Sequence, residues 1–248
     1  MINILFPMVG KSQFFNTEEY IFPKPLIEIN GEPMIEIAIE NYKKIKLSKN
    51  FIFIVSSEHC SKYHLDDILY LLTDRKCIVI KLANETAGAA CSALMAVDYI
   101  NNKEELIIAN SDQIIDDEIE TIINSFRLKK VDAGVVCFDS VHPRWSFVRL
   151  DKNNKIIEAA EKKPLSKNAI AGFYYFKEGK LFVEAAMKSI LKARHVNGIY
   201  YVAPVLNELV LENKNLEIYK IMNDKYHTFY SPQKISEYEN RNINRWKD

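Results

Sequence analysis

The chain has 248 residues, 48% of them hydrophobic, so it can bury one large α/β core or two smaller ones. Its 33 basic and 33 acidic side chains cancel to a formal net charge of +0, which argues against a general electrostatic affinity for nucleic acid. There is no apolar run of about 18 residues and the N-terminus leads directly into a strand pattern, so we expect neither a membrane span nor a signal peptide and predict a cytoplasmic protein.

Short apolar runs alternate with helix-like segments in the first part of the chain. This order predicts a doubly wound, mostly parallel (Rossmann-like) α/β sheet with helices on both faces. The strand-like runs are Ile2–Phe6, Phe51–Ser56, Cys77–Leu82, Glu105–Ala109 and Ala133–Phe138, and the helix-like segments are Pro33–Lys46, Cys60–Leu72, Ala89–Ile100 and Asp117–Lys129.

After residue 138 the alternation gives way to a mixed pattern. Two strand-like runs on either side of Lys152-Asn153-Asn154 predict a hairpin. No linker, repeat or low-complexity tract separates this part from the first, so we predict a single domain over residues 1–248, with portions at 1–138 and 139–248. The later strand-like runs are Ser146–Asp151, Lys155–Ala160 and Ala171–Phe176, and the later helix-like segments are Leu181–Ala193 and Pro204–Glu212.

The segment from Phe22 to Gly31 places Lys24 between two prolines. Each proline fixes its own φ and restrains the residue before it, so the lysine side chain leaves from a stiff backbone. In open α/β sheets the ligand lies beyond the carboxyl ends of the strands. Because Lys24 follows the loop after the first strand, we expect its ammonium group to contact phosphate groups at that edge.

The loop after the first strand is the first of two small-residue segments expected at this edge. Met8, Val9, Gly10, Lys11 and Ser12 are its candidate binding residues. Gly10 allows a close approach of the backbone to a ligand, and Lys11 adds a positive charge. A single glycine is also typical of an ordinary turn, and that alternative stays open.

The second small-residue segment runs from Thr86 to Ser92 and opens a helix-like segment. Thr86, Gly88 and Ala89 leave room for a planar base beside free backbone N–H groups. Close packing of the helix against the sheet would select the same small residues, so both interpretations stay open.

Asn110, Ser111 and Asp112 end the apolar run Leu106–Ala109 and place a carboxylate at the mouth of the sheet. Mg²⁺ prefers oxygen ligands, keeps several of its waters and bridges phosphate oxygens. We therefore predict that Asp112 binds Mg²⁺, for which Mn²⁺ can substitute. The alternative is that Asp112 only caps the next helix.

Basic residues in the second portion are candidates for holding an anionic ligand. Glu161-Lys162-Lys163-Pro164 offers two ammonium groups, although a short charge run is often simply solvated. Arg144 has a planar fork that suits either a carboxylate or a phosphate. Its neighbour Trp145 belongs either to the site or to the packed interior.

Several of these motifs resemble a known enzyme family. Pro7-Met8-Val9-Gly10, Pro23-Lys24-Pro25-Leu26 and Pro33-Met34-Ile35 resemble the N-terminal signature of the nucleotidyltransferases that act on sugar phosphates and related phosphomonoesters. The resemblance extends over residues 1–232. It implies a GT-A-like nucleotidyltransferase fold, with the nucleotide bound by residues 1–138 and a phosphorylated acceptor bound by residues 139–248.

Other segments resemble one branch of that family, found in capsule and surface-polysaccharide gene sets. They are Asn110-Ser111-Asp112-Gln113, His142-Pro143-Arg144-Trp145-Ser146 and the segment from Asn197 to Glu208. With the paired phenylalanines Phe14-Phe15, they are most similar to the CTP:phosphoglutamine cytidylyltransferases that supply capsular phosphoramidate. This resemblance implies transfer of CMP from CTP to L-glutamine phosphate with release of pyrophosphate.

The resemblance also implies roles for single residues. Lys24 would bind the triphosphate, Asp112 the Mg²⁺ ion, and Lys162 rather than Lys163 the acceptor phosphate. The implied nucleotide-binding residues are Met8, Val9, Gly10, Lys11, Ser12, Lys24, Thr86, Gly88, Ala89, Ser111 and Asp112, and the implied acceptor-binding residues are Arg144, Trp145, Glu161, Lys162, Gly172, Asn197 and Tyr201.

The chain also departs from the family pattern. Ser12 and Phe14 stand where the family has a glycine and an arginine, and no acid stands directly before Thr228, so Asp224 is the candidate for a second metal ligand. Two alternatives therefore stay open: a sugar-1-phosphate uridylyl- or thymidylyltransferase, and a catalytically silent nucleotide-binding regulatory protein. The expected partners are CTP and a small phosphomonoester, with no nucleic acid and no membrane, and a homo-oligomer is left open.

Overall fold

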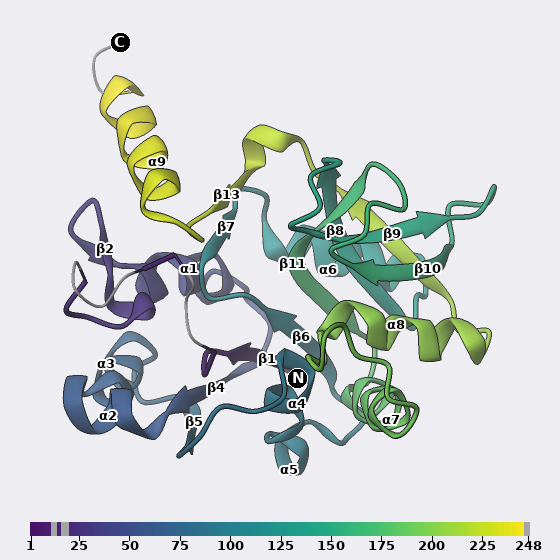
Figure 1. Ribbon diagram of the computed structural model, residues 1–248, viewed down its shortest axis with the longest axis horizontal. Helices are drawn as coiled ribbons and strands as arrows, with labels where there is room; N and C mark the ends of the chain where they lie inside the picture. The colour runs from purple at the N-terminus through teal and green to yellow at the C-terminus, as the bar shows by residue number, and fades with distance from the viewer. Residues whose placement is uncertain (11–13, 16–19, 246–248) are drawn as a thin grey trace.

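A computed structural model describes residues 1–10, 14–15 and 20–245 of the chain. A large twisted sheet runs through the molecule, and its parallel part has the order β6-β1-β4-β5 (Figure 1). Neighbouring strands in this part are parallel, as the sequence predicts. The bounds are β1 Ile2–Pro7, β4 Lys49–Ser56, β5 Cys77–Leu82 and β6 Glu105–Ala109.

Helices cover both faces of this sheet, which confirms the doubly wound arrangement. Side chains alternate along each strand, so Phe51, Phe53 and Val55 of β4 enter one buried cluster and Ile52 and Ile54 the other. Helices α1 (Met34–Lys43), α2 (Ser57–Tyr63), α3 (Leu65–Leu72) and α6 (Ile119–Leu128) contribute to the first cluster, and α4 (Ala89–Leu94), α5 (Val97–Ile100), α7 (Gly179–Leu191) and α8 (Val202–Leu211) to the second.

The second portion adds antiparallel strands to the same sheet. Strand β11 (Asn168–Phe176) lies between β6 and β8 (Ala133–Asp139) and is antiparallel to both. Strand β8 therefore runs in the direction of β6 without being its neighbour. The predicted hairpin is present as β9 (Ser146–Leu150) and β10 (Ile156–Glu161). Strand β12 (Leu216–Lys220), which the sequence pattern does not reveal, pairs with β8 in parallel.

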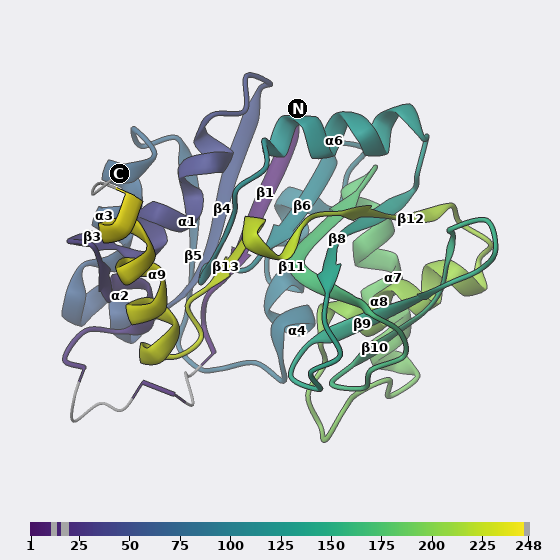
Figure 2. The same cartoon turned by 90° about the horizontal axis from the view of Figure 1, so that it is seen from above.

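Several short elements are not expected from the sequence. A two-stranded ribbon joins β7 (Gln113–Ile115) to β13 (Tyr226–Thr228), and β2 (Glu28–Ile29) pairs with β3 (Glu32–Pro33). Two short 3-10 helices, η1 (Lys24–Leu26) and η2 (Asn223–Lys225), precede β2 and β13 respectively. The last helix, α9 (Pro232–Arg245), lies beside β2 and β13, on the opposite side of the molecule from the β9–β10 hairpin (Figure 2).

Some predicted boundaries are wrong for local reasons. The expected helix Cys60–Leu72 is broken at His64, whose φ of 54° is incompatible with a continuous right-handed helix. Pro33 belongs to β3, and the helix begins one residue later. The expected helix Ala89–Ile100 is divided between α4 and α5. None of the described helices is long and apolar enough to cross a bilayer.

Candidate active site

Lys24 and Asp112 meet at the carboxyl edge of the parallel strands. Lys24 begins η1, and the N–H of Leu26 donates to the carbonyl of Pro23 at 2.8 Å, which fixes the turn that carries the lysine. Asp112 follows the end of β6, and its carboxylate forms an ion pair with the Lys24 ammonium group. The two side chains are 23% and 21% exposed, so both groups are accessible to a ligand.

The ammonium group of Lys24 lies over the aromatic ring of Phe15. The Lys24 Nζ atom is 5.7 Å from the centre of this buried ring, a distance at which a cation is attracted to the π face. Phe15 and Phe14 stand in the loop where the family pattern has an arginine. Phe15 therefore stabilises the Lys24 ammonium group through a cation–π contact, a role that the sequence does not predict.

A buried hydrogen-bond network holds the segment that carries Asp112. The N–H of Phe229 donates to the Asp112 carbonyl at 2.8 Å. The Gln113 amide donates to the carbonyls of Ala171 at 2.6 Å and Gly172 at 3.0 Å, and its oxygen accepts from the Tyr226 hydroxyl at 3.1 Å. Asp112 is thus positioned from two sides, by β11 and by the segment that follows β13.

Gly172, an expected acceptor-site residue, has a structural role in this network. Its φ is 55°, in the left-handed region that favours glycine. A Cβ atom there would lie 2.4 Å from both the Asn110 amide nitrogen and the Gln113 amide oxygen. The register of β11 shifts at the same place, between Ile170 and Tyr174. Gly172 therefore allows the segment that follows β6 to lie close against β11.

The two predicted metal ligands are not brought together. In the β7–β13 ribbon Tyr226 is opposite Ile115, and Phe229 lies beside Asp112. Asp224 precedes Tyr226 in η2 and so lies towards the far end of this ribbon. Within the described part of the chain, no cluster of three or more histidine, cysteine, aspartate or glutamate side chains could hold a metal ion by itself. A metal site here would have Asp112 as its protein ligand, which suits Mg²⁺ because this ion commonly keeps waters and binds substrate phosphates.

The loop after β1 is described only in part. Met8 and Val9 are buried, and the N–H of Met8 donates to the carbonyl of Ile54 at 2.8 Å, so both residues continue the sheet. Gly10 is exposed, and among the described residues, its chain neighbours apart, no atom lies within 4 Å of the place a Cβ would take. Lys11 and Ser12 lie outside the described residues.

The Thr86–Ser92 segment is tied to the second portion of the chain. The Tyr200 N–H donates to the Ala87 carbonyl at 2.7 Å, and the Ala90 N–H donates to the Tyr200 carbonyl at 3.0 Å. Gly88 has φ 123°, and a Cβ there would lie 2.4 Å from the Tyr200 carbonyl oxygen. The Thr86 hydroxyl donates to the Gly88 carbonyl at 2.9 Å. The small residues therefore permit this backbone contact, with half-exposed Ala89 beside it, and base binding by Thr86, Gly88 and Ala89 stays a prediction.

The predicted acceptor residues gather at the open end of the β9–β10 hairpin. The N–H of Lys162 donates to the Trp145 carbonyl at 3.0 Å, which joins the start of β9 to the end of β10. The Lys162 ammonium group donates to the Tyr201 hydroxyl at 3.1 Å and lies 5.3 Å from the centre of that ring. Lys163 instead lines a different cavity, between β10 and α8. Asn197 is exposed in the turn before Tyr201, with φ 52°.

The Glu161 side chain is hydrogen-bonded within the second portion of the chain. Its carboxylate accepts a hydrogen bond from the Ser146 hydroxyl on the adjacent strand. Burial raises the pKa of the Glu161 carboxyl, and the Ser146 hydrogen bond and the Lys162 charge oppose this rise. Burial and the nearby Glu161 carboxylate raise the pKa of the Tyr174 hydroxyl. Glu161 is thus held by the protein, and its charge is disfavoured by its surroundings.

Tyr230 links the two halves of the site, although the sequence reasoning did not select it. Its ring centre is 5.7 Å from that of Phe14 in the loop after β1 and 6.1 Å from that of Trp145 at the start of β9. The Arg144 guanidinium carbon lies 4.1 Å from the centre of the same ring. Trp145 also contacts Phe138 and Tyr226, so the tryptophan both packs against the protein interior and borders the site.

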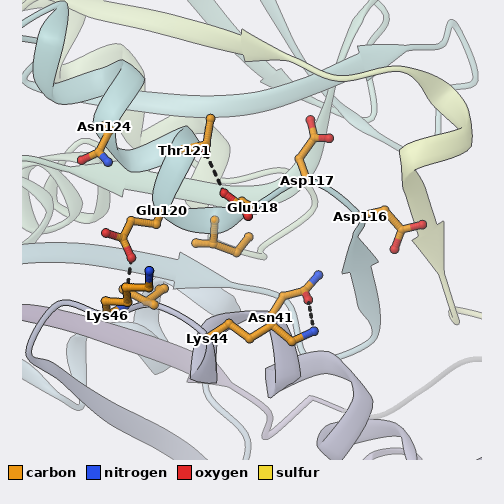
Figure 3. Close-up of a pocket in the computed structure, with 11 residues that line it drawn as sticks. Asn41, Lys44, Lys46, Asp116, Asp117, Glu118, Glu120, Thr121 and Asn124 are labelled. Carbon is orange, nitrogen blue, oxygen red and sulfur yellow. Dashed lines mark hydrogen bonds between the residues drawn. The ribbon is translucent and has the colours of Figure 1, made fainter.

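A separate cavity of about 460 Å³ lies between the end of α1 and the start of α6 (Figure 3). Three of its carboxylates are engaged: Glu120 accepts from the Lys46 N–H at 2.8 Å, Glu118 accepts from the Thr121 hydroxyl at 3.2 Å, and Asp116 lies 2.9 Å from the His227 ring nitrogen Nε2. None of the predicted site residues lines it. The lining residues are Asn41, Lys44, Ile45, Lys46, Asp116, Asp117, Glu118, Ile119, Glu120, Thr121 and Asn124. This acidic lining is unsuited to a triphosphate.

Sequence comparison identifies a protein family and several curated relatives. The family model described as "Nucleotidyl transferase" matches residues 20–248. The bifunctional protein GlmU of Methanocaldococcus jannaschii is 28% identical over 194 residues, which cover 71% of this chain and 44% of that protein. The GlmU of Methanococcus aeolicus is 27% identical over 194 residues with the same coverage. The match therefore covers less than half the length of these curated relatives.

Solved structures share the fold over nearly the whole chain. The nucleoside-diphosphate-sugar pyrophosphorylase of Vibrio cholerae RC9 has a TM-score of 0.84 at 22% identity, covering 96% of this chain and 99% of that one. The inositol-1-phosphate CTP transferase of T. maritima has a TM-score of 0.75 at 13% identity, covering 96% and 94%. At these identities the similarity shows a common nucleotidyltransferase fold.

Proposed function

Because the chain belongs to the nucleotidyl transferase family, we propose that it transfers a nucleoside monophosphate from a nucleoside triphosphate to a small phosphorylated acceptor. The proposed donor is CTP, the transferred group is CMP, and pyrophosphate is released. L-glutamine phosphate is the proposed acceptor, and capsular phosphoramidate synthesis is the proposed setting. Donor, acceptor and setting rest on the similarity of the sequence motifs to the CTP:phosphoglutamine branch.

The contact between Lys24 and Asp112 carries this proposal. An ammonium group and a carboxylate from segments 88 positions apart meet where a ligand binds in sheets of this type. The lysine offers a positive charge to phosphate oxygens, and the aspartate offers oxygen to a cation. Lys162, at the end of the β9–β10 hairpin, is the proposed partner of the acceptor phosphate.

The chemistry requires positioning and charge neutralisation more than proton transfer. An oxygen of the acceptor phosphate attacks the α-phosphorus of the nucleotide, and the bond to the pyrophosphate leaving group breaks. The attacking oxygen is already anionic at neutral pH, so a strong general base is unnecessary. Lys24 would stabilise negative charge on the triphosphate and Lys162 would orient the acceptor. Mg²⁺ bound through Asp112 would supply further charge neutralisation on the phosphates.

The two portions of the chain are proposed to act as one domain, residues 1–138 on the nucleotide and 139–248 on the acceptor. The hydrogen bonds between Ala87, Ala90 and Tyr200 support this proposal because they join the two portions beside the site. Such contacts would favour a single cleft of fixed shape.

Pyrophosphate release tests the function. The protein is mixed with Mg²⁺ and each of CTP, UTP, dTTP, ATP and GTP, paired with L-glutamine phosphate, inositol 1-phosphate, glucose 1-phosphate and glucosamine 1-phosphate. We expect release with CTP and L-glutamine phosphate, and a lower kcat/KM for the purine nucleotides. Preference for UTP or dTTP with a sugar 1-phosphate would favour the uridylyl- or thymidylyltransferase alternative. If no pair releases pyrophosphate, while CTP still binds by calorimetry, the protein is a silent nucleotide-binding protein instead.

A further inference from the structure

A cavity of about 480 Å³ lies between strand β10 and helix α8, which run side by side in the second portion of the chain (Figure 1). Its volume is within the range of about 300–1,000 Å³ typical of small-molecule sites. Of the described residues proposed to bind substrate, only Glu161 lines it, and Lys24, Asp112 and Lys162 do not. The cavity is therefore distinct from the groups proposed to carry the reaction.

The walls of this cavity are fixed by hydrogen bonds between α8 and the edge of the sheet. Strand β10 is the last strand at its end of the large sheet, where β9 is its neighbour. The Ala159 N–H donates to the side-chain oxygen of Asn207 at 2.8 Å, and the Asn207 amide donates to the Ala159 carbonyl at 2.8 Å. One side chain of α8 thus binds the strand edge, so the cavity is a built-in feature of the fold.

Apolar side chains give this cavity a hydrophobic part. Ile157 of β10 and Leu211 of α8 both line it, and they are 43% and 65% exposed. Val196 and Pro204 add further apolar surface to the lining. A ligand with an apolar body would remove this surface from water, which favours its binding.

The charges of the lining leave an excess of cations. Lys163 and Arg194 line the cavity, and neither has an acidic partner among the described residues. Each carboxylate of the lining is instead engaged by another residue of the protein. The pairs are Glu158 with Arg149, Glu161 with Ser146, and Glu208 with Lys192. The unpaired charge that faces the cavity is therefore positive.

His195 adds a third donor to the same lining. Its ring nitrogen Nδ1 accepts a hydrogen bond from the Gly198 N–H at 3.1 Å, so the proton of the neutral ring is on Nε2. An ammonium group, a guanidinium group and an imidazole N–H thus line one cavity. A phosphate group matches this set, because it carries about two negative charges at neutral pH and three strong acceptor oxygens.

We propose that this cavity is a second ligand site, for an organic phosphate whose body has apolar surface. The positive charge of Lys163 and Arg194 binds the phosphate, and Ile157 and Leu211 contact the body. This inference goes beyond the proposed function, because it requires no transfer reaction.

The neighbouring lysines 162 and 163 serve different sites in this proposal. Lys162 has a φ of 54°, in the left-handed region, which interrupts the extended strand at this point. Its ammonium group donates to the Tyr201 hydroxyl, whereas Lys163 lines the cavity. A substitution of one lysine can therefore be compared directly with the same substitution of the other.

Three probes separate the two parts of the proposed ligand. The compound 1-naphthyl phosphate has an apolar body and a phosphate, 1-naphthol lacks the phosphate, and inorganic phosphate lacks the body. Each is titrated by calorimetry into the wild-type protein and into Lys163→Gln, Arg194→Gln, Lys162→Gln and Lys167→Gln. Lys162→Gln removes the proposed acceptor contact, and Lys167 is the matched control because it is an exposed lysine of the same portion that does not line the cavity.

We expect the wild type to bind 1-naphthyl phosphate more tightly than either of the other probes. Lys163→Gln and Arg194→Gln should each weaken that binding about 10- to 150-fold, the loss typical of a charge-assisted hydrogen bond. Lys162→Gln and Lys167→Gln should leave it near the wild-type value. All four side chains are exposed, so Tm should stay near the wild-type value in every variant.

The proposal is overturned if the wild type does not bind 1-naphthyl phosphate, or binds another probe as tightly. It is also overturned if neither Lys163→Gln nor Arg194→Gln weakens the binding. An equal loss in Lys162→Gln would place the probe in the acceptor site, and an equal loss in Lys167→Gln would show a general effect of surface charge. Because calorimetry measures binding without turnover, these results are independent of whether pyrophosphate is released.

Discussion

Replacing Gly172 by alanine should damage the active site by disturbing the packing around Gln113, without removing any side chain proposed to bind substrate. The left-handed φ of 55° costs a residue with a side chain about 1–2 kcal/mol. The added methyl group would lie 2.4 Å from both the Asn110 amide nitrogen and the Gln113 amide oxygen. Asn110 is exposed and can move, but Gln113 is only 3% exposed and is hydrogen-bonded on three sides.

The cost follows from these contacts. Displacing the Gln113 amide would leave buried polar groups without partners, which costs about 1–3 kcal/mol. With the backbone strain, the free energy of unfolding should fall by about 2–5 kcal/mol. For a chain of this length that corresponds to a decrease in Tm of about 4–20 °C. Because Asp112 precedes Gln113, kcat/KM for pyrophosphate release should fall as well, even at a temperature where the variant is folded.

Gly31→Ala is the matched control. Gly31 also has a positive φ, 84°, but no atom of the described residues other than its chain neighbours lies within 4 Å of the position of its Cβ, so only backbone strain is added. Its Tm should fall less than that of Gly172→Ala, and its kcat/KM should stay near the wild-type value. Tyr226→Phe, which removes one hydrogen bond to Gln113, gives a milder second variant if Gly172→Ala does not fold. Equal losses of Tm and activity in Gly172→Ala and Gly31→Ala would show that close packing against Gln113 does not support the site.

Three further predictions concern charged groups of the site. Asp112→Ala should abolish turnover with little change in Tm; near-normal activity at saturating Mg²⁺ would exclude the metal role. Lys162→Ala should lower kcat/KM for the acceptor about 10- to 150-fold and leave CTP binding unchanged, whereas Lys24→Ala should mainly weaken CTP binding. Lys163→Ala should have a smaller effect than either variant. If Lys163→Ala lowers kcat/KM for the acceptor more than Lys162→Ala does, then Lys163 is the residue that contacts the acceptor phosphate. Burial raises the pKa of Glu161, so the folded state keeps this proton to a higher pH than the unfolded chain, and stability falls as pH rises from about 4.3 through the raised value. The Tm of Glu161→Gln, measured across this pH range, should lack that decrease. If the Tm of the variant and of the wild type fall in parallel with rising pH, Glu161 is not the group responsible.

The parallel half of the fold could be predicted because its signals are local. Runs such as Phe51–Ser56 are apolar on both faces, and each lies between helix-like segments of ordinary length. The sheet order could not be read in the same way. Strand β11 enters between β6 and β8 through pairings between residues far apart in the chain, and no local pattern encodes that choice.

The same limit applies to the short elements around the site. Strands β7 and β13 have three residues each and are paired across more than a hundred positions of the chain. Their register decides where Asp224 lies, so counting back from Thr228 could not place that carboxylate. Phe15 and Tyr230 were missed for a related reason, since an aromatic residue in a loop gives no sign of which cation it will contact.

Contact between Lys24 and Asp112, by contrast, follows from the rule that ligands bind beyond the carboxyl ends of parallel strands. The contact also means that neither residue is an isolated charge before a ligand binds. In the structure each residue neutralises the charge of the other. Binding of a triphosphate with a cation would replace this Lys24–Asp112 ion pair by two others, Lys24 with the triphosphate and Asp112 with the cation. A lysine-to-alanine change leaves the carboxylate without this partner, and an aspartate-to-alanine change frees the ammonium group. Single substitutions therefore combine a lost ligand contact with a freed neighbour, and their effects on nucleotide binding cannot be added. Only the double substitution, compared with both single ones, separates the contribution of each group to the nucleotide from their interaction with one another.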